Sequence, residues 1–215
     1  MRSISQCSDF ARKSWQARGY WIVPGGACSF TAHANRAGAK AVAADILYQK
    51  DKATLERLGE IGIQKVYANT AWMSGHNFSF YGDLTGHREA RESALRDFVA
   101  DFSHENYLYA KFPHLRLAGH FDLCLSGHFL FTYDDRFDYD FHLTSVISMT
   151  KLADEVRIFP LVDMNNSRAG SDKPFSPFVY RLLDELPEFG LRAEIIPVDF
   201  EFQRGAGFVM KIIKD

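Results

Sequence analysis

Short apolar runs alternate with stretches of helical periodicity along most of the chain. Gly, Pro or polar residues bound the apolar runs, and each run has the length of a strand. The predicted strands cover residues 19–23, 39–44, 106–110, 121–125, 155–161 and 193–198, and the predicted helices cover residues 30–37, 52–58, 88–102, 141–152 and 177–186. This alternation is typical of an α/β protein with a parallel sheet covered by helices.

The segment 199–214 has a different pattern. Gly205 and Gly207 separate two β-like runs in the sequence DFEFQRGAGFVMKIIK, which is a hairpin signal. We therefore expect a seventh strand that returns antiparallel beside the sixth. The predicted fold is a seven-stranded sheet with its last strand antiparallel and helices on both faces.

Length and composition are those of one ordinary globular domain over residues 1–215. Of the 215 residues, 47% are hydrophobic and 24% are charged, so a core can form without disulfides or metal. The cysteines Cys7, Cys28 and Cys124 lack any CxxC spacing, and the histidines show no metal-ligand spacing, so we expect no metal site. This cysteine usage favours a reducing, cytoplasmic location.

Charge and hydropathy narrow the range of partners. The formal net charge is -2, which gives no basic surface for nucleic acid. We expect residues 1–18, which are polar and mixed, to form an N-terminal helical segment rather than a signal peptide. No apolar stretch has the length of a membrane span. The expected partner is therefore a small molecule, with no nucleic acid and no membrane, and the oligomeric state does not follow from the sequence.

Residues 66–87 form an irregular, aromatic-rich segment between two predicted helices. Long irregular insertions in a compact domain are functional or disordered, and this one is too aromatic for disorder. We predict a lid over a substrate, and a purely structural segment is the alternative. The candidate substrate contacts in this segment are Trp72, His76, Phe78 and Tyr81.

The turn after the first predicted strand and the end of the second are the expected ligand sites. Ligands in open parallel sheets bind beyond the carboxyl ends of the strands, where the strand order reverses. Gly25, Gly26 and Ala27 let a ligand approach the backbone. About twenty residues later Asp45, with Ile46 beside it, ends the second strand and is placed to accept bonds from ribose hydroxyls. A ligand-free tight turn and a capping Asp are the alternative interpretations.

Four segments together resemble the class I S-adenosylmethionine-dependent methyltransferases. They are WIVPGGACSFTAHANRAGAKAVAADILY (21–48), FDLCLSGHFLFTY (121–133), EVRIFPLVD (155–163) and EFQRGAGFVMKI (201–212), the last of which resembles the closing hairpin of a bacterial subgroup of unassigned substrate. The resemblance implies a Rossmann-like fold and S-adenosyl-L-methionine as the cofactor. It also implies that Ser126 and Gly127 line the methionine end of the cofactor, and that the turn with Lys111 and Phe112 touches the adenine.

The first motif departs from the pattern of that family. The family usually carries Asp or Glu on the first strand, two residues before the first glycine of a DxGxGxG motif. This chain has Ile22 at the acidic position, Pro24 and Cys28 at two of the glycine positions, and retains only Gly26. Pro24 also removes a backbone donor. We expect this degenerate motif to weaken cofactor binding.

His128 is the candidate catalytic residue. It follows the fourth predicted strand at the ligand-facing edge, and imidazole titrates near neutral pH. A structural histidine that holds the turn is the alternative. Tyr133, in the charged loop that follows, is a further candidate substrate contact.

The predicted function is S-adenosylmethionine-dependent methyl transfer to a small-molecule acceptor. A non-catalytic methyltransferase-like binding or regulatory module is the alternative, because the first motif is degenerate. A nicotinamide dehydrogenase is a weaker interpretation, since the closing hairpin fits the methyltransferase topology better.

Overall fold

The computed structural model describes residues 19–68, 71–165 and 167–215. The predicted N-terminal helical segment 1–18 lies outside the described residues.

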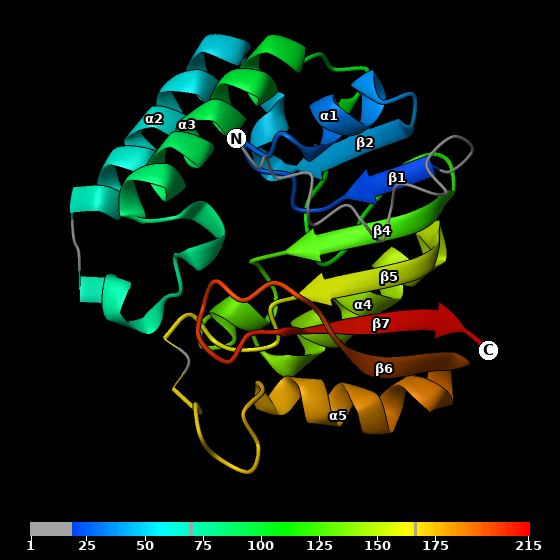
Figure 1. The fold of residues 1–215 in the computed structure, drawn as a ribbon. Helices are drawn as coiled ribbons and strands as arrows, with labels where there is room; N and C mark the ends of the chain where they lie inside the picture. The colour runs from blue at the N-terminus through cyan, green and yellow to red at the C-terminus, as the bar shows by residue number, and fades with distance from the viewer. Residues whose placement is uncertain (1–18, 69–70, 166) are drawn as a thin grey trace.

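One sheet of seven strands forms the centre of the protein (Figure 1). Its strands are β1 (Gly19–Ile22), β2 (Lys40–Asp45), β3 (Tyr107–Tyr109), β4 (Phe121–Gly127), β5 (Ala153–Phe159), β6 (Leu191–Pro197) and β7 (Phe208–Lys214). Their order is β3-β2-β1-β4-β5-β7-β6. Strands β1 to β5 pair in parallel, whereas β7 runs antiparallel to both β5 and β6. The predicted sheet, with its last strand antiparallel, is confirmed.

Helices cover both faces of the sheet, as predicted. They are α1 (Phe30–Arg36), α2 (Lys52–Ala68), α3 (Leu84–Asp101), α4 (Tyr139–Leu152) and α5 (Pro177–Glu185). Successive strand residues point to opposite faces. Tyr20 therefore packs with Ala34 of α1, whereas Trp21 lies in the main core with Val146 of α4 and Val179 of α5. Within the described residues, no helix has the length and apolar character that crossing a membrane requires.

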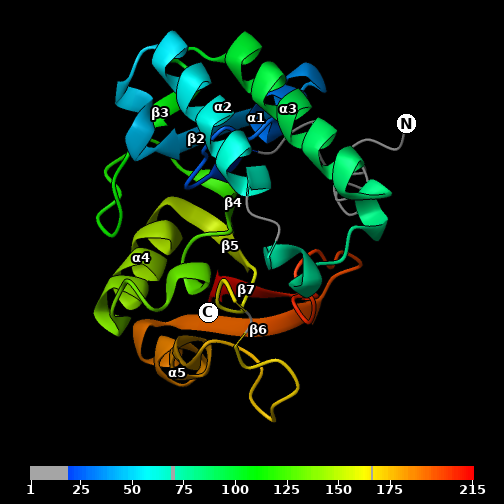
Figure 2. The ribbon, with the colours of Figure 1, turned by 90° about the vertical axis from the view of Figure 1, so that its left-hand side faces the viewer.

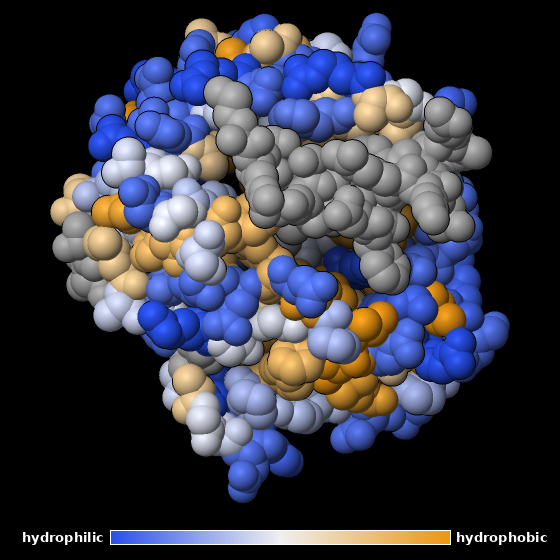
Figure 3. Space-filling view, viewed as in Figure 1, coloured by the Kyte–Doolittle hydropathy of each residue, from blue (hydrophilic) through white to orange (hydrophobic). Residues whose placement is uncertain are grey.

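The view of Figure 3 separates two kinds of surface. Polar side chains dominate the outer surface of α2 and α3, and apolar side chains gather lower down, over β6 and β7. Ile196 and Ile213 are half-buried on these two strands. Water therefore meets a more apolar surface on the β6–β7 half of this face.

Helix α2 is longer than predicted and shortens the segment expected to be irregular. The pattern predicts a helix over 52–58 because Gly59 and Gly62 interrupt it, yet α2 continues to Ala68. A Cβ atom at Gly59 would overlap the Leu95 side chain of α3, so this glycine allows the two helices to approach closely. Asp83 caps α3 by accepting the Gly86 N–H (2.8 Å), which starts α3 before the predicted residue 88.

The connection between α2 and α3 therefore comprises residues 69–83 rather than 66–87. Two short 3₁₀ helices lie in it, η4 (Ala71–Gly75) and η5 (Ser79–Tyr81). Residues 71–83 of this connection lie beside the β6–β7 connection, residues 198–207 (Figure 2). The Asn77 N–H donates to the Phe202 carbonyl oxygen (2.6 Å), and the Arg204 N–H donates to that of Gly75 (3.0 Å). We call residues 71–83 the lid segment, although movement as a lid stays a prediction.

Candidate functional site

The carboxyl ends of β1 and β4 lie side by side where the strand order of the sheet reverses. From β1 the chain leads to β2 on one side, and from β4 it leads to β5 on the other. The Val23 N–H donates to the Leu125 carbonyl oxygen (3.0 Å), which fixes the turn after β1 to β4. Ligands of open α/β sheets bind at such a switch point. Figure 2 views the protein from this edge of the sheet.

Asp45 joins the end of β2 to the turn after β1. Its carboxylate is 6% exposed and accepts the Gly26 N–H on one oxygen and the Leu47 N–H on the other, both at 2.9 Å. Gly26 has a φ of 51°, which glycine adopts without strain. A carboxylate offers about four acceptor positions, so about two remain for a ligand. The structure thus brings together two of the predicted cofactor-binding residues.

Gly25 is required by a neighbouring side chain. A Cβ atom at this position would overlap the Tyr48 hydroxyl and the Ala43 methyl group. The Tyr48 hydroxyl donates to the Gly26 carbonyl oxygen (2.6 Å), and burial holds the Tyr48 pKa well above its ordinary value. The turn therefore packs closely against Tyr48, and Ala27 is the predicted turn residue that is exposed.

Exposed apolar side chains lie beside Asp45. Ile46 follows Asp45 directly and is 45% exposed, and Tyr109, which pairs with Asp45 from β3, is 50% exposed. Surfaces of this kind suit a planar ring. The sequence predicts Ile46 but not Tyr109, because residues 106–110 have the pattern of a buried strand. The sequence feature that could have indicated Tyr109 is its position at the carboxyl end of that strand, where ligands bind.

Lys111 and Phe112 follow β3 but have different environments. Phe112 stacks on Phe129, with ring centroids 5.1 Å apart, and packs against the main core. Lys111 is exposed. The predicted adenine contact of these two residues stays a prediction.

The end of β4 presents an unsatisfied hydroxyl and an open glycine. Ser126 is 2% exposed, and its Oγ has no hydrogen-bond partner among residues 19–68, 71–165 and 167–215. Gly127 is exposed, and a Cβ atom there would meet no neighbour within 4 Å. Buried hydroxyls usually have a partner, so Ser126 and Gly127 leave room and one polar group for a ligand.

His128 stands at the same edge with a left-handed backbone, at a φ of 53°. Its N–H donates to the Phe159 carbonyl oxygen (2.7 Å), which holds the turn against β5. The side chain is exposed to water, yet the protein surrounds it closely enough that desolvation lowers its pKa. Electrostatic repulsion from Arg91 and His76 lowers the pKa further. His128 is therefore mainly a neutral imidazole at neutral pH, and a neutral imidazole can accept a proton.

The predicted substrate contacts of the lid segment pack around one ring of the β6–β7 connection. Phe202 lies at the centre of this group, which we call the lid cluster. Its ring centroid is 4.8 Å from that of His76 and 4.5 Å from that of His87. The other members are Trp72, Phe78 and Tyr81, at 6.2, 5.5 and 5.7 Å from Phe202. Because these rings pack against one another, the cluster also holds the lid segment against the β6–β7 connection.

Buried within the lid cluster, His87 differs from an ordinary histidine. Tyr67 Oη lies 2.6 Å from Nδ1 of His87. Burial, with smaller contributions from the charges of Arg91 and His76, lowers the pKa of His87 to about 4. This side chain is therefore neutral at neutral pH.

Tyr133 lies apart from the lid cluster, on the loop after β4. Its ring packs beneath the Arg136 guanidinium, at 4.7 Å, and against Phe129. The adjacent Asp134 forms an ion pair with Arg168 (3.4 Å), which ties this loop to the one after β5. A role in substrate binding stays a prediction for Tyr133.

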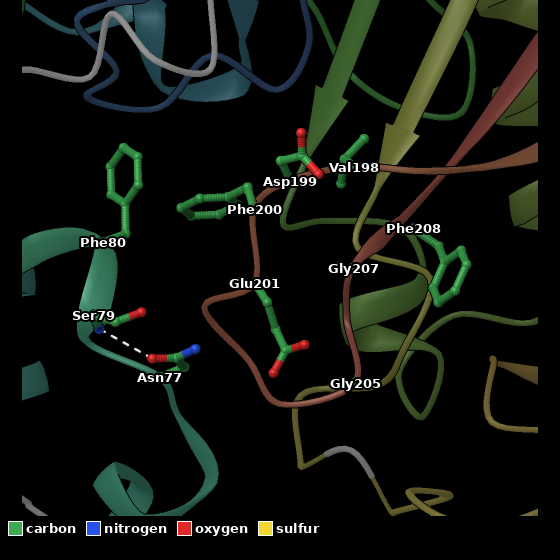
Figure 4. A pocket seen from close by; sticks show the side chains of 10 residues that line it. All are labelled: Asn77, Ser79, Phe80, Val198, Asp199, Phe200, Glu201, Gly205, Gly207 and Phe208. Carbon is green, nitrogen blue, oxygen red and sulfur yellow. Dashed lines mark hydrogen bonds between the residues drawn. The ribbon is translucent and has the colours of Figure 1, made fainter.

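A cavity of about 540 Å³ lies between the lid segment and the β6–β7 connection (Figure 4). Asn77 and Phe80 line it from the lid segment, and Asp199, Phe200 and Glu201 line it from the connection. The sequence did not point to this cavity, because residues 199–207 have the pattern of a hairpin turn. The only sequence feature that could have indicated the cavity is Phe200 with one acidic residue on each side, Asp199 and Glu201.

The comparisons with known proteins support the fold. No known protein-family profile matches the chain. An uncharacterized protein of Methanocaldococcus jannaschii is 25% identical over 195 residues, which cover 88% of this chain and 83% of that protein.

Among solved structures, the glycopeptide N-methyltransferase MtfA bound to S-adenosyl-L-methionine superposes with a TM-score of 0.53 at 10% identity. The match covers 99% of this chain and 87% of MtfA. MtfA bound to sinefungin gives a TM-score of 0.51 at 10% identity, with 98% of this chain and 86% of MtfA covered. The chain therefore has a Rossmann-like methyltransferase fold, and at this identity the likeness concerns the fold alone.

Proposed function

We propose that the protein is an S-adenosylmethionine-dependent methyltransferase that acts on a small molecule. The observation that carries the proposal is the contact between Asp45 and Gly26 at the switch point of a methyltransferase fold. A buried carboxylate with free acceptor positions, next to a glycine turn, suits the ribose of an adenosine.

The residues around this contact fit the remaining parts of the cofactor. Ile46 and Tyr109 offer the adenine an apolar surface. Ser126 offers a buried hydroxyl without a partner among the described residues, and Gly127 leaves open space. When bound, S-adenosylmethionine supplies an electrophilic methyl group on a sulfonium.

The chain itself contributes position and a proton acceptor. Holding an acceptor in line with the methyl group supplies much of the rate of such a reaction. His128 is exposed at the end of β4, and its lowered pKa keeps it neutral, so it can take a proton from an acceptor.

A non-catalytic binding module is the second candidate, and three features of the first motif favour it. Tyr48 occupies the space next to Gly25, and Pro24 offers no backbone donor. Ile22 is 7% exposed and stands where the family has a carboxylate. Each of these features removes a contact that a methyltransferase would use for the cofactor.

Calorimetric titration with S-adenosylmethionine and with S-adenosylhomocysteine separates the two candidates. The proposed enzyme binds both, with Asp45 contributing to each affinity. Absence of detectable binding for both compounds would overturn the methyltransferase proposal in favour of the non-catalytic module.

A further inference from the structure

The cavity between the lid segment and the β6–β7 connection has aromatic walls. Phe80 and Phe200 meet edge-to-face, with ring centroids 5.1 Å apart at an angle of 90°. Figure 4 shows these two rings close together and coming from opposite segments. A volume of about 540 Å³ is within the range of small-molecule sites, roughly 300–1,000 Å³.

The polar side of the cavity carries negative charge. Asp199 and Glu201 flank Phe200 on one short segment and line the same cavity. Both side chains are exposed, and neither has a hydrogen bond or an ion pair within the described part of the chain. The cavity-lining residues include no Lys, Arg or His among those described. Unpaired carboxylates next to aromatic rings attract cations, by charge and by cation–π contact.

The cavity lies close to the end of β4. Phe200 contacts Phe159, with ring centroids 5.9 Å apart, and Phe159 contacts His128 at 5.6 Å. One phenylalanine ring therefore separates the cavity wall from His128. A ligand in the cavity would be at the same edge of the sheet as Ser126 and Gly127.

We propose that this cavity binds an organic ammonium ion with an aromatic body, and that this amine is the methyl acceptor. The binding site stands on its own, whereas the acceptor role rests on the proposed function. As an acceptor, the amine would have to move past Phe159 to the end of β4, where it would give one proton to His128 and form the new N–C bond with the freed lone pair. The electron pair of the broken S–C bond would stay on sulfur.

Calorimetry with 2-phenylethylamine tests the binding site, with 2-phenylethanol and 3-phenylpropionate as neutral and anionic controls. We expect the amine to bind about tenfold more tightly than the alcohol, and the anion to bind least. The double variant Asp199→Asn/Glu201→Gln should bind the amine no better than the alcohol. Glu56→Gln/Glu60→Gln, which removes two exposed charges from α2, should leave amine binding unchanged.

Phe200→Leu tests the aromatic wall, and it should weaken amine binding while the melting temperature stays close to that of the wild type. Equal affinity for the three probes, or equal loss in both double variants, would overturn the site. Titration of the same proteins with S-adenosylmethionine separates the two proposals. Cofactor binding without amine binding overturns the amine site alone. Amine binding without cofactor binding supports the site and overturns the acceptor role.

Discussion

At the scale of single residues, Asp45 combines a structural role with a predicted binding role. It accepts two backbone N–H groups and has acceptor positions left. Asp45→Asn retains one acceptor oxygen but removes the charge. We expect S-adenosylmethionine affinity to fall by about 1.5–3 kcal/mol, measured by calorimetry. Glu60→Gln, an exposed change on α2, is the control, and unchanged affinity in Asp45→Asn would remove Asp45 from the site.

The close packing of Gly25 against the Tyr48 hydroxyl can be tested by substitution. In Gly25→Ala, the new methyl group must displace the Tyr48 hydroxyl and approach Ala43. We expect a loss of about 1–3 kcal/mol in the free energy of unfolding, as for other overpacked sites. Adding Tyr48→Phe removes the clashing hydroxyl and should recover part of this loss. Independent, additive effects in urea denaturation would contradict the contact.

At the scale of elements, the contact between α2 and α3 depends on which glycine faces the partner helix. Gly59 lies against Leu95, whereas a Cβ atom at Gly62 would meet nothing within 4 Å. Gly62→Ala should therefore stabilise the protein by about 0.5–1 kcal/mol through helix propensity. Gly59→Ala should destabilise it by about 1–3 kcal/mol, because Leu95 must move. Thermal melts of the two variants measure the difference, and a gain in both would contradict close packing at Gly59.

The lid cluster should make stability depend on pH. The pKa of His87 is about 4 in the folded protein, against an ordinary value of 6.5. Between these values the unfolded chain binds more protons, so the free energy of unfolding should fall as pH decreases from about 6.5 to about 4. The fall should be on the order of 2 kcal/mol.

Urea denaturation at a series of pH values tests this dependence. His87→Gln should reduce the slope within that window, and the part that remains is expected from His128, whose pKa is also lowered. His114→Gln, which removes an exposed histidine, should leave the slope unchanged. A profile that stays steep in His87→Gln would assign the dependence to another group.

Elements with a strong local pattern could be predicted, and contacts between distant segments could not. Each strand has its own apolar run, and the Gly205–Gly207 hairpin signal correctly gave the antiparallel β7. The end of α2 was missed because Gly59 is favoured by contact with Leu95, which no local pattern reports. Similarly, Phe202 belongs to a local turn pattern, yet it forms the centre of the lid cluster through tertiary contact.

At the scale of the whole molecule, the two proposed ligands occupy different parts of one edge of the sheet. The proposed cofactor contacts lie on the turn after β1 and at the ends of β2 and β4, whereas the cavity lies between the lid segment and the β6–β7 connection. Hydrogen exchange should therefore slow in different segments. We expect S-adenosylmethionine to protect residues 24–29 and 45–48, and 2-phenylethylamine to protect residues 77–81 and 199–207. The same protection pattern for both ligands would contradict two separate sites.

The backbone hydrogen bonds between the lid segment and the β6–β7 connection limit where insertions and deletions can occur during evolution. His76 and Gln203 form an antiparallel bridge, and hydrogen bonds from Asn77 to Phe202 and from Arg204 to Gly75 flank it. The spacing of donors and acceptors along one segment must match that along the other. An insertion or deletion within residues 75–77 or 202–204 would shift this match by whole residues. Among relatives that keep the bridge, length changes are therefore expected outside these two stretches.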